Sequence, residues 1–130
     1  MNASGERPVP WKTFETWLVV AVALHSYAVG FFLLFFTEWG ARFGGWGDVS
    51  PLFFARQAGI FHFVVASGYL VEYFRARSVW FLLLAKATAT VFLVAMTFHD
   101  GGPWALPLSA LADALMGLAV WAVHREASAA

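Results

Sequence analysis

Four ionisable residues lie near the middles of long apolar segments: His25, His62, Lys86 and Asp113. A charge in hydrocarbon costs about 2.5–3.5 kcal/mol on insertion scales, and it persists mainly where a partner or water meets it. Lys86 and Asp113 carry opposite charges and could neutralise each other, while the two imidazoles could donate or accept protons. The pattern predicts a polar site inside a membrane protein.

Helical phase indicates which other side chains would join these four residues. With 3.6 residues per turn, His62 shares one helix face with Tyr69. The face of His25 is otherwise apolar, so its partner must come from another helix. We therefore predict a ligand-binding site in which Lys86 and Asp113 orient a small molecule. Its members are His25, His62, Tyr69, Lys86 and Asp113.

A purely structural interpretation of the same residues stays open. An ion pair between Lys86 and Asp113 would set the packing register of two helices, because every other arrangement would expose a charge to hydrocarbon. His62 and Tyr69 could likewise be a hydrogen-bonded core pair.

The composition indicates an integral membrane protein. Hydrophobic residues make up 61% of the 130 residues, charged residues 12%, and the mean hydropathy is +0.69, which leaves too little polar surface for a soluble globule. The eight basic residues balance eight acidic ones and form no patch, so nucleic acid is not an expected partner. The chain has no cysteine, which excludes disulfides and cysteine-ligated metal centres.

Four apolar segments reach the roughly 20 residues that a helix needs to cross the hydrocarbon core. They are Thr13–Phe36, Leu52–Phe74, Val79–Phe98 and Trp104–His124. The connections are too short to build a second core, so the chain from 1 to 130 predicts one all-α domain, a four-helix transmembrane bundle.

Loop residues predict how the segments begin and turn. Ser50 followed by Pro51 is typical of a helix cap and first helical position, so the second span should begin there. The glycine-rich segment Trp39–Gly47 predicts an interfacial turn, and Asp100–Pro103 a tight turn between antiparallel neighbours. The small residues Ala127–Ala130 predict a frayed end.

Basic residues predict the orientation in the membrane. Five flank one side of the spans and one or two flank the other, which places both termini in the cytoplasm. The five are Arg7, Lys12, Arg75, Arg77 and Arg125; the others are Arg42 and Arg56.

No catalytic motif of known spacing is present, so the sequence leaves open whether the protein is an enzyme. It predicts no metal site. Two histidines on adjacent spans could in principle hold a haem, and a histidine and a tyrosine with apolar walls suit a quinone. A haem- or quinone-binding subunit of a membrane oxidoreductase is therefore the alternative interpretation.

A family resemblance lies in the second half of the chain. The run ARQAGIFHF is followed by SGYLVEY, then by a lysine in the third span and an aspartate in the fourth. This arrangement, over Ala55–Val123, resembles the small four-helix DoxX-like membrane proteins. The resemblance implies a multi-pass protein of the bacterial inner membrane, sometimes an accessory subunit of a quinone-linked oxidoreductase. We accordingly expect a protein that binds a small molecule in the bilayer or joins other membrane subunits.

Overall fold

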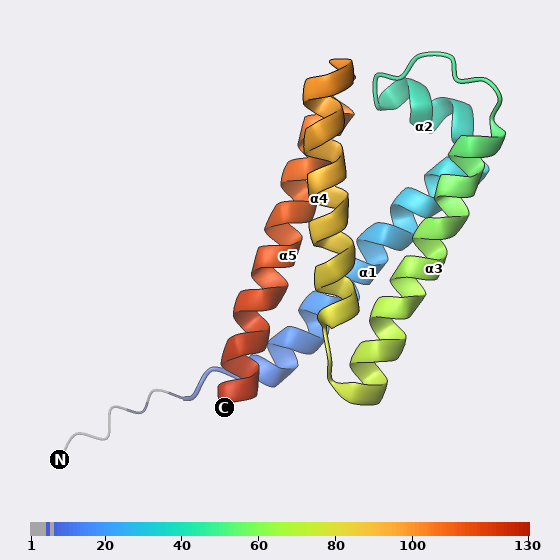
Figure 1. Ribbon diagram of the computed structural model, residues 1–130. Helices are drawn as coiled ribbons and strands as arrows, with labels where there is room; N and C mark the ends of the chain where they lie inside the picture. The colour runs from blue at the N-terminus through green and yellow to red at the C-terminus, as the bar shows by residue number, and fades with distance from the viewer. Residues whose placement is uncertain (1–4, 6) are drawn as a thin grey trace.

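The computed structural model describes residue 5 and residues 7–130, and this part of the chain is all-helical, as predicted. Residues 1–4 and 6 of the predicted domain lie outside the described residues. The helices, shown in Figure 1, are α1 (Trp11–Phe35), α2 (Thr37–Phe43), α3 (Phe53–Ala76), α4 (Trp80–Asp100) and α5 (Ala105–Ala129).

Three of these helices, α1, α4 and α5, are long and apolar enough to cross a membrane, which indicates a multi-pass membrane protein. The fourth long helix, α3, is of similar length but carries charged residues near both ends, including Arg56, Glu72 and Arg75. Its role as a fourth span therefore stays a prediction.

The start of α3 differs from the prediction. The helix begins at Phe53, Leu52 occupies the cap position, and no side chain caps the helix. The first backbone hydrogen bond of the helix runs from the Arg56 N–H to the Leu52 carbonyl, so Ser50 and Pro51 precede the helix. The predicted cap at Ser50 is therefore wrong.

The segment predicted as an interfacial turn is partly helical, because α2 occupies Thr37–Phe43. The Thr37 hydroxyl donates to the Leu33 carbonyl at 2.7 Å, and the rings of Trp39 and Phe43 stack with centroids 5.2 Å apart. These contacts extend helical structure past the end of α1. The chain then turns at Gly45 and Gly47, both at positive φ.

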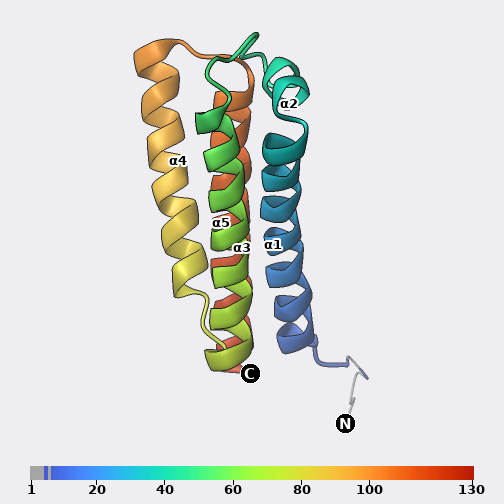
Figure 2. The ribbon, with the colours of Figure 1, turned by 90° about the vertical axis from the view of Figure 1, so that its right-hand side faces the viewer.

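The last helix is longer than predicted. The sequence places its end at His124, but α5 continues to Ala129, and Ala127, predicted to be frayed, is buried. The turn between α4 and α5 is confirmed, with Gly101 in the left-handed region at φ 58°. The two helices are antiparallel and pack closely (Figures 1 and 2).

The long helices associate as two pairs, α1 with α3 and α4 with α5. Glycines allow the first pair to approach closely, because a Cβ added at Gly59 would lie 2.9 Å from the Gly30 carbonyl oxygen and from the Leu34 nitrogen. Small residues at such crossings are typical of membrane helices. Thus α1 and α3 cross with their backbones in contact.

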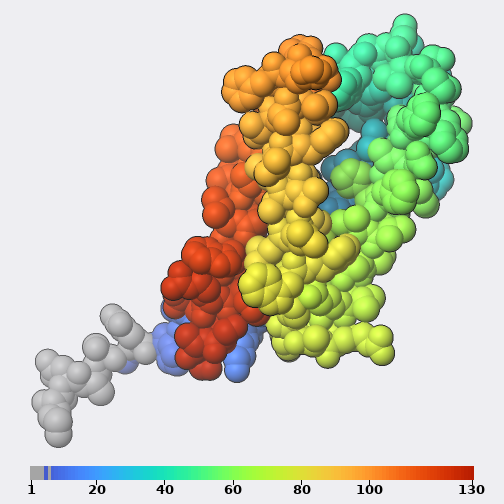
Figure 3. Space-filling view, viewed as in Figure 1, coloured from blue at the N-terminus to red at the C-terminus, as the bar shows by residue number. Residues whose placement is uncertain are grey.

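The two pairs meet mainly at the end that carries the termini, which we call the closed end. Here all four long helices contribute to one hydrophobic core, formed by Val19, Val22, Ala23, Ala66, Tyr69, Tyr73, Val79, Leu82 and Val120. The opposite end, which carries α2, we call the open end. Figure 3 shows a hollow there between α3 and α4, with atoms of α1 visible inside it.

Candidate ligand site

A buried ion pair joins α4 and α5. The Lys86 ammonium donates to Oδ1 of Asp113 at 2.7 Å, and the two side chains are 6% and 15% exposed. Gly117, one turn after Asp113, makes room for the lysine stem, because a Cβ there would lie 3.2 Å from the Lys86 Cβ. The predicted contact between Lys86 and Asp113 is confirmed.

Tyr69 of α3 lies against this pair. Its buried ring centroid is 5.9 Å from Nζ of Lys86, at the outer limit of a cation–π contact. Tyr69 also interacts with Ser26 of α1, which is itself buried. The structure therefore brings Tyr69 together with Lys86 and Asp113, and adds Ser26, which the sequence reasoning missed.

The two histidines lie at the margin of the site. His62 is half-buried and His25 is exposed, yet both are close enough to Lys86 and Asp113 to be influenced by their charges, and His62 also by His25. Among the described residues, neither imidazole makes a hydrogen bond to a protein group.

The sequence places His25 in the interior of the bundle, whereas its side chain is exposed. The face of α1 that packs against other helices carries Val19, Val22, Ala23, Ser26 and Gly30. His25 lies to one side of that face, and apolar residues that share its stripe, such as Ala21 and Phe32, are exposed as well. Periodicity alone could not show which stripe of a uniformly apolar helix would be packed.

The arrangement suits recognition of a small polar group. Lys86 has three N–H donors, of which one reaches Asp113, and the second carboxylate oxygen of Asp113 can still accept a hydrogen bond. Each imidazole can donate from one ring nitrogen and accept at the other. In the described part of the chain, no cluster of three or more His, Cys, Asp or Glu residues could hold a metal ion.

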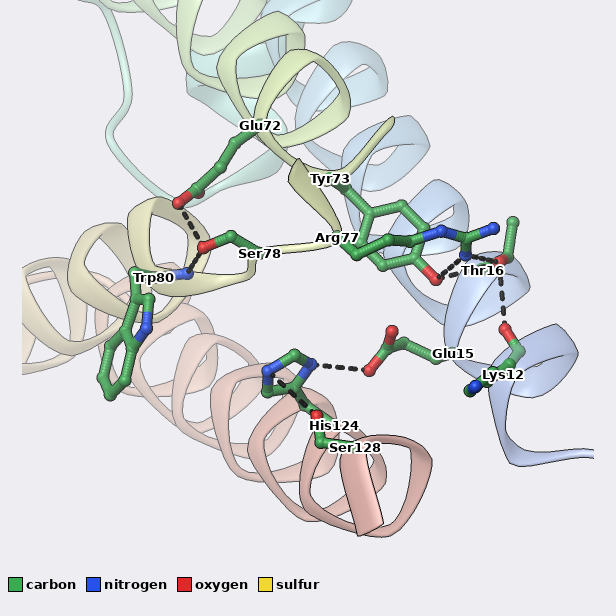
Figure 4. Close-up of polar contacts among 10 residues, drawn as sticks. All are labelled: Lys12, Glu15, Thr16, Glu72, Tyr73, Arg77, Ser78, Trp80, His124 and Ser128. Carbon is green, nitrogen blue, oxygen red and sulfur yellow. Dashed lines mark hydrogen bonds and ion pairs between the residues drawn. The ribbon is translucent and has the colours of Figure 1, made fainter. Parts of the chain in front are cut away.

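A second polar cluster lies at the closed end, and the sequence reasoning missed it (Figure 4). Glu15 of α1 is hydrogen-bonded to Nδ1 of His124 on α5 at 2.7 Å, with side chains 6% and 27% exposed. The sequence signal that could have indicated this contact was the single carboxylate, Glu15, within the first apolar segment. In a bundle with an even number of antiparallel spans, the start of the first and the end of the last lie on the same side.

Tyr73 of α3 and Arg77, which follows the end of α3, complete this cluster. Arg77 Nη1 donates to Tyr73 Oη at 2.8 Å and to Thr16 Oγ1 at 3.1 Å, which ties α3 to α1 (Figure 4). Glu72 accepts from the Ser78 hydroxyl at 2.6 Å and from the Phe81 N–H at 2.8 Å. A carboxylate from α3 thus satisfies a free backbone donor in the first turn of α4.

Two cavities lie on the surface of the part of the chain that the structure describes, away from the candidate site. One is an apolar groove of about 350 Å³ between α4 and α5. It is lined by Thr90, Val94, Thr97, Phe98, Pro107, Ala110, Leu111 and Ala114. A polar one of about 140 Å³ follows α2 and is lined by Glu38, Arg42, Gly47, Asp48 and Val49.

Comparisons of the chain with protein-family models, with curated proteins and with solved structures find no match. The function must therefore be inferred from the chain's own residues.

Proposed function

We propose that this protein binds a small molecule within the bilayer at the site formed by His25, His62, Tyr69, Lys86 and Asp113. The observation that carries the proposal is the buried Lys86–Asp113 pair, whose charges influence two imidazoles that make no protein hydrogen bond among the described residues. A ligand of suitable shape would complete the hydrogen bonding of all four groups.

A structural role of the pair explains less of the arrangement. The short turn at Gly101 already holds α4 and α5 antiparallel, so an ion pair is not needed to choose their partner. A structural pair would also not account for His62 and His25, which lie near the same charges from the other helix pair. Polar residues inside a membrane protein more often belong to a functional site.

The proposal includes a four-span topology with both termini in the cytoplasm. Supporting it, α3 lies along α1, crosses it at Gly59 and carries its charged residues near its ends. The Glu15–His124 contact brings the start of α1 and the end of α5 together, as an even number of crossings requires. Reporter fusions at the C-terminus and in the Trp39–Gly47 segment should lie on opposite sides; the same side for both would overturn this topology.

A relation to the DoxX-like proteins of the bacterial inner membrane, and a role as accessory subunit of a larger membrane complex, belong to the same proposal. They rest on the short runs around His62 and Tyr69, and on the positions of Lys86 and Asp113. Purification in mild detergent, followed by mass spectrometry of co-purifying subunits, would test the complex.

Of the two alternative cofactors, the geometry disfavours haem. The backbones of α1 and α3 touch at Gly30 and Gly59, and a Cβ at Gly30 would lie 3.0 Å from the Cβ of His62. This leaves no space between the two helices for a macrocycle held by His25 and His62. A quinone remains a second candidate, because Lys86 beside the Tyr69 ring could donate to a carbonyl oxygen.

The test is retention of a small molecule by protein transferred directly from membranes into nanodiscs and examined by native mass spectrometry. The variant Lys86→Met with Asp113→Asn removes both charges of the site and should lose the molecule. The matched control, Arg42→Gln with Asp48→Asn, removes the exposed ion pair after α2 and should retain it. Equal retention by both variants, or an empty wild-type protein, would overturn the proposal, and a visible absorption spectrum checks for haem.

A further inference from the structure

We infer that the ligand is an amphipathic molecule of the lipid phase with an uncharged head group that both donates and accepts hydrogen bonds, such as a hydroxyl or a primary amide. This inference rests on the proposed function, because it names the chemical class that the Lys86–Asp113 site would take.

The charge of the site selects an uncharged head group. Lys86 and Asp113 lie 2.7 Å apart and neutralise each other, so an anion or a cation placed beside them is attracted by one partner and repelled by the other. A charged head group would lose its hydration without gaining a counter-ion. A neutral head group loses far less on leaving water.

The hydrogen-bonding capacity of the pair requires a ligand that carries both a hydrogen-bond donor and an acceptor. Two N–H donors of Lys86 are not used by Asp113, and the second carboxylate oxygen of Asp113 is an acceptor. A hydroxyl or a primary amide satisfies both partners at once. A ketone or an ether would leave the second carboxylate oxygen of Asp113 without a donor.

The route to the site indicates a lipid-phase molecule. The ammonium of Lys86 lies 5.9 Å from the centroid of the Tyr69 ring of α3, so the ion pair lies against the other helix pair, and Figure 3 shows a hollow between α3 and α4. Ala89 and Met96 lie one and three turns beyond Ala85, which packs against the shared core, and both are half-buried. The small side chain of Ala89 leaves room for an apolar chain, and the flexible side chain of Met96 can adapt to it.

The two helices that border the hollow, α3 and α4, carry exposed apolar side chains. Phe61 of α3 and Phe92 of α4 are exposed, as are most large hydrophobic residues of the long helices. In a membrane these side chains contact lipid, so a molecule would enter sideways from the bilayer. Its apolar chain would remain in the hollow, and its head group would reach the ion pair.

The experiment uses three photoreactive probes with the same diazirine-bearing hexadecyl chain and different head groups: an alcohol, a sulfonate and a quaternary ammonium. The two charged heads keep their charge at every working pH. Each probe is incorporated into nanodiscs with the full-length protein, and the labelled peptides are quantified by mass spectrometry. The alcohol should label residues around Lys86 about tenfold more than either charged probe, the ratio expected for a difference of about 1.4 kcal/mol.

Two variants, each with an alanine replaced by phenylalanine, show where the hexadecyl chain of the probe binds. Ala89→Phe places a large side chain one turn beyond Lys86 and should abolish labelling by the alcohol probe. Ala114→Phe fills the separate groove between α4 and α5 and should leave labelling unchanged. Neither substitution replaces a charged residue, and the melting temperatures of both variants check that they fold.

The outcomes separate this inference from the proposed function. Preferential labelling by the sulfonate or the quaternary ammonium, blocked by Ala89→Phe, would overturn the uncharged head group but leave a ligand site. Labelling by all three probes that Ala89→Phe does not change would mean that no site exists there, and both proposals would fail.

Discussion

At the closed end, each helix is tied to a neighbour by directional polar bonds. Glu15 joins α1 to α5 through His124, and Glu72 joins α3 to the start of α4. At the open end, contacts between aromatic rings take the place of these bonds. The ring centroids of Trp39 and Phe32 are 5.5 Å apart, and those of Phe43 and Trp104, at the start of α5, are 5.6 Å apart. Ring contacts tolerate several geometries, whereas a buried carboxylate must keep its partners.

This difference suggests a division of roles along the molecule. The closed end fixes the two helix pairs relative to each other by polar bonds and a shared core. The helices α3 and α4 make few contacts, and at the open end a hollow lies between them (Figure 3). The Lys86–Asp113 pair lies against Tyr69, a member of the shared core, so it borders the closed end.

The largest effect should come from breaking the central pair. Asp113→Asn leaves Lys86 as a buried charge without its partner, which costs about 3–5 kcal/mol when one member of a buried ion pair is removed. Adding Lys86→Met should recover much of this loss, because no charge is then left unpaired. Thermal unfolding of both single variants and the double variant in detergent gives the coupling energy. Losses that simply add would contradict the contact.

A smaller effect should follow from separating the backbones of α1 and α3. Gly59→Ala places a Cβ 2.9 Å from two backbone atoms of α1, so the helices must shift, at a cost of about 1–3 kcal/mol for overpacking. The matched control is Gly40→Ala in α2, where a Cβ has 3.6 Å to its nearest neighbour and should be tolerated. The melting temperatures of both variants test this expectation. Equal shifts would show that the close crossing of α1 and α3 is not essential for stability.

The smallest effects should contrast polar side-chain pairs from the two ends. Glu15→Gln keeps a hydrogen-bonding group beside His124 but removes its charge, for an expected loss of about 0.5–1.5 kcal/mol. Arg42→Gln at the open end breaks a pair whose side chains are 62% and 86% exposed, and should cost about 1 kcal/mol or less. Unfolding in detergent at low and high salt should show salt sensitivity for the Arg42–Asp48 pair alone. A larger loss for Arg42→Gln would contradict this comparison.

The sequence by itself determined the class of the protein and much of its secondary structure. Long apolar segments have few ways to satisfy backbone hydrogen bonds outside water, so hydropathy located the four long helices with modest errors at their ends. The pairing of Lys86 with Asp113 was predictable for a related reason. Two opposite charges in neighbouring apolar helices are strongly driven together.

Only the tertiary structure decided which faces pack. In a helix that is apolar all round, every stripe is equally able to face lipid or protein, so the outward position of His25 and the buried position of Ser26 depend on how α1 crosses α3 at Gly30 and Gly59. The Glu15–His124 bond likewise links residues 109 positions apart, which no local pattern connects. The hollow at the open end follows from the same packing, because two close helix pairs that share one core at the closed end need not meet at the other.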